Sequence, residues 1–267
     1  MIEGFVDIEG IKTFYQQVGD GPDLVLVHGW SFDHACWSGQ LSTLSGHSRV
    51  TVYDLPGCGK SGAPHSGFPF DLYIEHLYGF LQSLQIKSAV FAGHSMGGSI
   101  VLQYVVTFPS TVNSFVIVDS ELPNAAEAIA VKAAETAIHK LGLERTTPYF
   151  QNLFYGINFQ AANPQAMAEW RRQFLANSTD NLLSALSAWV NRQDVSPLLS
   201  KVACPSILLV GMEDLFASLA HAQALREAIP LAQLLPIGNA GHLTPQEQPT
   251  SVNAALDQAL AFVDSRS

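Results

Sequence analysis

Residues 93–98 read Gly-His-Ser-Met-Gly-Gly, and they follow the apolar run Ser-Ala-Val-Phe-Ala at 88–92. A serine with glycine two positions before it and two positions after it, between a buried strand and a helix, is the pattern of a nucleophile elbow. Such a turn is so tight that the serine takes a strained backbone conformation, and the flanking positions must be small. The pattern predicts that the hydroxyl of Ser95 projects from the end of a strand, with a helix N-terminus below it.

Strand-like runs alternate with helical patterns on both sides of this stretch. The spacing predicts a hairpin around Glu9-Gly10 and then buried strands that alternate with amphipathic helices. The predicted strands are 5–8, 12–18, 24–27, 49–54, 88–92, 114–118, 206–210 and 232–237, and the predicted helices are 35–44, 72–84, 99–108, 217–228 and 251–263. Regular alternation of this kind predicts an α/β fold with a mostly parallel, doubly wound sheet of eight strands.

The alternation stops between residues 121 and 195, where the sequence shows only helical patterns, at 125–141, 148–155, 164–175 and 181–190. We therefore predict a core domain formed by residues 1–120 and 196–267, interrupted after its sixth strand by a helical lid, residues 121–195.

Composition limits the classes of partner. Of the 267 residues, 48% are hydrophobic and 13% are charged, which supports one large core. The net charge is −10, and the largest basic cluster is the pair Arg171-Arg172. Nucleic acid and anionic membrane surfaces both require a positive face, so we expect neither as a partner.

Three further features indicate a cytoplasmic protein. The first residues lack the basic and apolar regions of a signal peptide, and no apolar run approaches the ~18 residues of a membrane span. The three cysteines, Cys36, Cys58 and Cys204, are odd in number and widely spaced. This usage is typical of free thiols in a reducing compartment.

A serine nucleophile needs an imidazole to accept its proton and a carboxylate to orient that imidazole. His242 follows the last predicted strand in the loop Gly-Asn-Ala-Gly-His, and parallel sheets place their sites in loops of this kind. Asp214, after the seventh strand, is the favoured carboxylate because it completes the chain order serine, acid, histidine. Asp119, after the sixth strand, is the alternative, and Glu213 is expected to point elsewhere.

An acyl-transfer site also needs two N–H donors for the oxyanion. The residue after the nucleophile, Met96, supplies one at a helix N-terminus. We assign the second to Trp30 in the sequence His-Gly-Trp, 28–30, and we expect its side chain to form a wall of the acyl pocket. His28 and His94 are expected to have structural roles.

No metal or cofactor is expected. The histidines show no HxH or HExxH spacing, and no Gly-x-Gly-x-x-Gly follows a strand. The sequence Gly-Cys-Gly-Lys-Ser, 57–61, departs from the spacing of a phosphate loop, so Asp54–Ser61 is predicted to be a structural turn.

Taken together, these motifs resemble the α/β-hydrolase superfamily. They are His28-Gly29, Asp54-x-Pro-Gly-x-Gly-x-Ser61, Gly93-x-Ser95-x-Gly97, Gly211-x-x-Asp214 and Gly241-His242. The resemblance implies the superfamily's fold and a Ser95–His242–Asp214 triad. Within it, the chain is similar to small carboxylesterases, a group that includes pimeloyl-acyl carrier protein methyl ester esterases, acyl lactonases and perhydrolases. Dehalogenases of this fold use an aspartate nucleophile. Position 95 holds a serine instead, so the dehalogenase class is excluded.

The resulting expectation is a serine carboxylesterase. An apolar channel lined by Trp30, Phe150, Phe154, Phe216 and Leu243 would accept a small uncharged acyl ester. The same residues leave open a lactonase or C–C bond hydrolase, a cofactor-free perhydrolase or oxygenase, and a ligand receptor with slow turnover. A substrate carried on an acyl carrier protein and steered by Arg171 and Arg172 is a further alternative.

Overall fold

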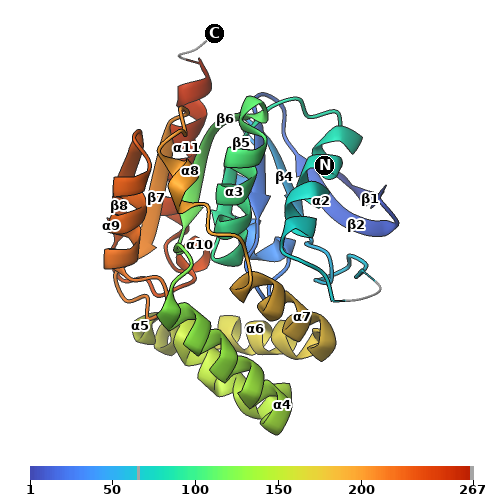
Figure 1. Cartoon of the computed structure of the whole chain (residues 1–267), viewed down its shortest axis with the longest axis vertical. Coiled ribbons are helices and arrows are strands. Elements are labelled where there is room, and N and C mark those ends of the chain that lie inside the picture. The colour runs from blue at the N-terminus through green and yellow to red at the C-terminus, as the bar shows by residue number, and fades with distance from the viewer. Residues whose placement is uncertain (65–66, 265–267) are drawn as a thin grey trace.

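The computed structural model describes residues 1–64 and 67–264, which form one twisted sheet covered by helices on both faces (Figure 1). The order of the strands is β1-β2-β4-β3-β5-β6-β7-β8. β1 and β2 pair with each other and β2 pairs with β4 in antiparallel fashion, whereas all other pairs are parallel. The strands are β1 Ile2–Ile8, β2 Ile11–Val18, β3 Asp23–Val27, β4 Arg49–Tyr53, β5 Ala89–His94, β6 Val112–Val118, β7 Ser206–Gly211 and β8 Ala232–Ile237. The predicted eight-stranded, mostly parallel sheet is confirmed.

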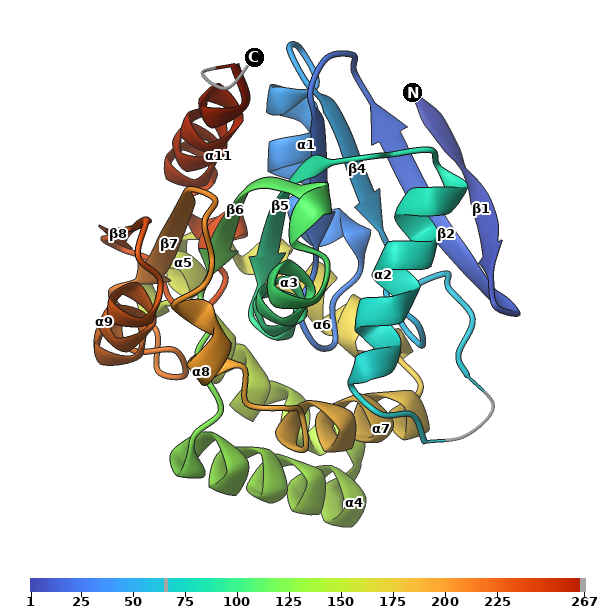
Figure 2. The same ribbon diagram turned by 45° about the horizontal axis from the view of Figure 1, so that its top comes forward.

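Helices cover the sheet in two layers. α1 (Ser38–Leu44) and α11 (Pro249–Asp264) pack against each other, and α2 (Asp71–Ser83) packs against α3 (Met96–Thr107) (Figure 2). α9 (Leu219–Ala228) contacts β7 and β8. The central strands β5 and β7 are buried along their whole length, as continuous apolar runs require in a doubly covered sheet.

A helical segment follows β6, as predicted, and lies beyond one end of the sheet (Figure 1). It contains α4 (Ala125–Phe154), α5 (Ile157–Ala162), α6 (Pro164–Ala176) and α7 (Thr179–Val190). α4 bends at Gly142, whose φ of 76° is outside the helical region. The break coincides with the end of the predicted helix 125–141, but the second piece of α4 begins before the predicted start at Pro148.

Short helices account for most other differences from the sequence-based expectation. The predicted helix 35–44 is divided into a 3-10 turn, η1 (His34–Trp37), and α1, and Asp33 caps the turn by accepting the Ala35 N–H at 2.8 Å. Single turns such as these carry too little periodicity to be recognised in a sequence. The turns that were missed are η2 (Pro109–Thr111), α8 (Ser196–Leu199) and α10 (Thr244–Glu247). Within the described ranges, no helix is both long enough and apolar enough to cross a membrane.

The turn from β5 into α3 holds Ser95 at φ 54° and ψ −121°. Its two flanking glycines have no room for a side chain. A Cβ on Gly93 would lie 2.3 Å from the carbonyl oxygen of Gly97, and a Cβ on Gly97 would lie 2.3 Å from the carbonyl oxygen of Val27 in β3. The glycines therefore allow α3 to start directly against the sheet, which explains their spacing around the serine.

The elbow yields a stability prediction. Gly97→Ala should lower the free energy of unfolding by about 3 kcal/mol, because the added methyl group overlaps backbone that cannot move aside. Gly238→Ala is the control, since a Cβ at Gly238 meets nothing within 4 Å. Urea denaturation followed by circular dichroism measures both variants. Equal stability of the two would contradict the steric argument.

Candidate active site

Three side chains from separate strand ends form one hydrogen-bonded chain. Ser95 follows β5, Asp214 follows β7 and His242 follows β8. Nε2 of His242 lies 2.9 Å from Oγ of Ser95, and Nδ1 lies 2.8 Å from Oδ2 of Asp214. All three residues are buried. The fold thus brings together the serine, the histidine and the favoured carboxylate that the sequence pattern singled out.

Asp214 is fixed by its own loop. Its Oδ1 accepts the N–H groups of Phe216 at 2.7 Å and Ala217 at 3.0 Å, which leaves Oδ2 directed at the imidazole. A carboxylate in this position selects the tautomer of His242 that carries its proton on Nδ1. The lone pair of Nε2 then faces the Ser95 hydroxyl, as proton abstraction requires.

Opposing effects set the pKa of His242. Burial lowers it, but the charge of Asp214 and the hydrogen bond to Asp214 raise it, with smaller contributions from Asp119 and Glu121. The net result is a pKa above the ordinary histidine value of 6.5. The carboxylates around the ring therefore stabilise the imidazolium form.

Asp119, the alternative acid, is used differently. Its carboxylate accepts the backbone N–H of Gly211 at 2.9 Å and that of Thr244 at 3.1 Å. Burial, followed by the charge of Asp214, raises the pKa of Asp119 well above its ordinary value. Asp119 therefore connects the loop that carries Asp214 to the loop that carries His242, and Asp214 makes the contact with the ring.

The two backbone donors assigned from the sequence belong to segments that lie beside Ser95. Met96 is the first residue of α3, and the loop that holds Trp30 passes so close that a Cβ on Gly29 would lie 3.0 Å from Cβ of Ser95. Within the described residues, neither the backbone N–H of Trp30 nor that of Met96 donates to a protein acceptor. Both groups remain free to donate to a bound oxygen atom.

Two buried histidines organise the surrounding loops. His28 accepts the Leu55 N–H on Nε2 at 2.9 Å, and its Nδ1 lies 2.8 Å from the carbonyl oxygen of Gly29. Nε2 of His94 lies 2.6 Å from the carbonyl oxygen of His242. Burial, with a further effect of His242, lowers the pKa of His94 to about 3, so this ring is neutral. Its Nε2–H donates to the carbonyl oxygen of His242, so this ring takes no part in proton transfer.

An apolar cavity of about 210 Å³ opens above the serine, and both Ser95 and His242 line it. The rings of Phe154 and Phe216 flank the imidazole, with centroids 5.8 and 5.4 Å from its own. No lysine, arginine, aspartate or glutamate is among the lining residues. These are Trp30, Phe32, Ser95, Ala130, Val131, Ala134, Tyr149, Phe150, Leu153, Phe154, Leu186, Trp189, Leu215, Phe216 and His242.

The cavity corrects one expectation and adds residues that the sequence analysis missed. Leu243 does not line it: this side chain is fully buried, and its backbone N–H bonds to the carbonyl oxygen of Phe154, which directs the residue into the protein. Larger lining residues absent from the prediction include Phe32, Val131, Leu153, Leu186 and Leu215. The helical spacing of Leu186 and Trp189 on the buried face of α7 was the available signal.

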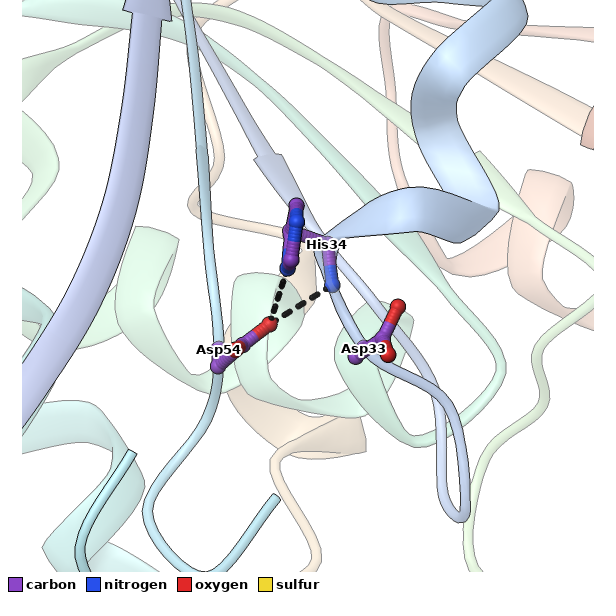
Figure 3. Close-up of side chains that lie close together, drawn as sticks. All are labelled: Asp33, His34 and Asp54. Carbon is purple, nitrogen blue, oxygen red and sulfur yellow. Dashed lines mark hydrogen bonds and ion pairs between the residues drawn. The ribbon is translucent and has the colours of Figure 1, made fainter. Parts of the chain in front are cut away.

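A second polar cluster, formed by Asp33, His34 and Asp54, lies beside the turn after β4 (Figure 3). Its ligand-type atoms lie within 4.8 Å of one another. However, Asp54 already accepts the His34 backbone N–H at 2.8 Å, His34 Nδ1 at 2.6 Å and the Lys60 N–H at 2.8 Å. Burial lowers the pKa of His34, but the hydrogen bond to Asp54 together with the charges of Asp54 and Asp33 raises it overall. This geometry is that of an ion pair that holds a turn.

The chain belongs to the α/β hydrolase fold family, whose model matches residues 22–249. RutD of Pseudomonas syringae, provisionally named a carbamate hydrolase, is 29% identical over 90% of this chain and 94% of its own. The 3-oxoadipate enol-lactonase 2 of Acinetobacter baylyi is 26% identical over 93% of this chain and 91% of its own. A solved structure, a thermophilic esterase from Thermogutta terrifontis, superposes with a TM-score of 0.88 at 23% identity and covers 98% of both chains. Family and relatives identify a hydrolase.

The electrostatics of the site can be tested directly. The His242 ring should titrate above pH 6.5, and Asp214→Asn should move its pKa below 6.5, because burial remains while the main opposing charge is lost. NMR titration of the histidine Cε1–H resonances measures both values. His94 serves as the internal control and should stay neutral down to about pH 4, given its pKa of about 3. An unchanged His242 pKa in Asp214→Asn would refute the account.

Proposed function

We propose that this protein is a serine hydrolase that cleaves carboxylic esters. The observation that carries the proposal is the continuous chain from Oγ of Ser95 through the imidazole of His242 to the carboxylate of Asp214. A buried serine in a strained turn, in contact with an oriented imidazole, is the arrangement that makes a hydroxyl nucleophilic.

The geometry supports a two-step reaction. His242 Nε2 takes the hydroxyl proton as Ser95 Oγ attacks the ester carbonyl carbon, and the N–H groups of Trp30 and Met96 stabilise the resulting oxyanion. Asp214 stabilises the imidazolium, which donates its proton to the departing alkoxide. A water molecule, deprotonated by the same imidazole, then attacks the acyl-enzyme, and the imidazolium returns that proton to Oγ of Ser95 as the acid is released.

The cavity supports an uncharged acyl group of modest size. Its volume of about 210 Å³ is somewhat larger than the ~150 Å³ cavity that accommodates a benzene ring. Its lining has no charged side chain to pair with a charged acyl group, so a short aliphatic or single-ring acyl chain fits best. Because α4 and α7 form much of the wall, we also propose that the helical segment 121–195 acts as a lid that defines the acyl site.

Two features refine the substrate class. A lactone is a cyclic ester and would use the same groups, and the enol-lactonase relative supports lactones as a second substrate class. A carrier-bound acyl group is less well supported. Arg171 bonds to Gln151 at 2.6 Å and Arg172 pairs with Glu169, so both arginines are engaged within the helical segment. We therefore propose a free small molecule as the substrate.

Loss of the nucleophile is the first test. Ser95→Ala should lower kcat on p-nitrophenyl butyrate and on a γ-lactone by about 10⁴-fold or more. Ser120→Ala is the control, because this buried serine lies at the end of the neighbouring strand and should be dispensable. In the wild type, kcat/KM should fall as the pH drops through the raised pKa of His242, since only the neutral ring accepts a proton. Activity in Ser95→Ala within tenfold of wild type would end the proposal.

The second test concerns the acyl pocket. Leu186→Ala enlarges the cavity and should move the preferred chain length in a p-nitrophenyl ester series upward by one to three carbons. Leu182→Ala is the matched control, since Leu182 is equally buried one turn earlier in α7 but does not line the cavity. Both changes should destabilise the protein by about 2–5 kcal/mol. A shift in both variants, or in neither, would show that the cavity does not bind the acyl chain.

A further inference from the structure

Glu247 is a buried carboxylate that accepts hydrogen bonds from the backbone on both sides of His242. It ends the short helix α10, is 6% exposed and, within the described residues, has no cationic partner. Its Oε1 accepts the N–H of Gly241 at 3.0 Å and of Leu243 at 3.2 Å. Its Oε2 accepts the N–H of Gly156 at 2.9 Å, in the turn that follows α4 in the helical segment.

The same turn, residues 154–156, makes further contacts with the loop that carries His242. The carbonyl oxygen of Phe154 accepts the N–H of His242 at 2.9 Å and of Leu243 at 3.1 Å. The hydroxyl of Tyr155 donates to Oε1 of Gln246 at 2.7 Å. The two backbones approach so closely that a Cβ on Gly241 would lie 2.5 Å from the nitrogen of Gly156. Residues 154–156 and 241–247 therefore form one hydrogen-bonded unit, which we call the corner.

We propose that Glu247 is a positioning residue that couples the helical segment above the cavity to the imidazole of His242. The inference rests on the proposed function, because it assumes that His242 is the general base. Glu247 has no contact with Ser95 or with the cavity, so its effect on catalysis passes through the backbone of residues 241–243. The helical segment cannot move at the corner without also moving the imidazole, and any opening of the cavity must occur elsewhere in the segment.

The chemistry of the carboxylate suits this role. Burial raises the pKa of Glu247, while the three backbone N–H groups lower it and offset much of the cost of an unpaired charge. A glutamine has nearly the same shape, but one of its two terminal atoms is a donor. Glu247→Gln therefore places an N–H against a backbone N–H on one side of the corner and breaks the link between the two segments.

The experiment compares Glu247→Gln with Glu227→Gln, which removes the same charge from an exposed position on α9. We expect kcat on p-nitrophenyl butyrate to fall by about 10- to 100-fold in Glu247→Gln with KM within threefold, because a small displacement of the base affects chemistry more than binding. The low-field NMR signal of the His242 Nδ1 proton should weaken. Backbone amides at 154–156 and at 241–244 should exchange faster together. Glu227→Gln should leave all three readouts at wild-type values.

Tyr155→Phe tests the coupling from the helical side and decides the matter if Glu247→Gln does not fold. It removes only the hydroxyl bond to Gln246, and it should lower kcat by about 2- to 10-fold and speed exchange at 241–244. A folded Glu247→Gln, or failing that a Tyr155→Phe, with wild-type kcat and an unchanged low-field signal would overturn the coupling. Loss of the proposed function is a separate result: it would appear as full activity in Ser95→Ala, while the NMR and exchange readouts would still report on the corner.

Discussion

Ser95 occupies a left-handed turn that exists only because the backbones on both sides of it are in direct contact. Gly93, Gly97 and the end of β3 pack without intervening side chains, and the Ser95 N–H bonds to the carbonyl oxygen of Val118 in β6 at 2.9 Å. This packing fixes the direction of Oγ and starts α3 beneath it. The loop that carries Trp30 can approach for the same reason. Each of the other groups in the site is placed relative to this one turn.

The parallel sheet supplies the second requirement, which is convergence. Ser95 and His242 are 147 positions apart in the chain, yet their side chains lie within hydrogen-bond distance because both follow the carboxyl ends of strands in one sheet. Strand ends alone do not set side-chain geometry to a few tenths of an ångström. Here that is done by loop-to-loop bonds, which run from Asp119 to the loops of Asp214 and His242, and from His94 to the carbonyl group of residue 242.

The sequence predicted the parts of the site that depend on local backbone conformation. The glycine spacing around Ser95 encodes a steric constraint, and the Gly-His pair after the last strand and the chain order singled out His242 and Asp214. The sequence also indicated the break in α4, because the predicted helix ends one residue before Gly142. Leu243 was misassigned because its orientation depends on how Phe154 packs over the loop. Val131 and the role of Glu247 depend on where an inserted helical segment lies, which no local pattern encodes, and for Leu186 the helical spacing indicates only a buried face of α7.

The buried carboxylates near the imidazole favour its protonated form, and backbone N–H groups reduce this effect. Asp119, Asp214 and Glu247 are all buried near His242. Burial and the charge of Asp214 raise the pKa of Asp119, and burial and the charge of Glu213 raise the pKa of Glu247. Unscreened, this charge would hold the imidazole in its protonated form and prevent it from acting as a base. Each carboxylate instead accepts two or three backbone N–H groups, which spreads its charge over fixed dipoles. A neutral imidazole is therefore available to take the serine proton, while the loops that carry the acids and the base are held together by the same bonds.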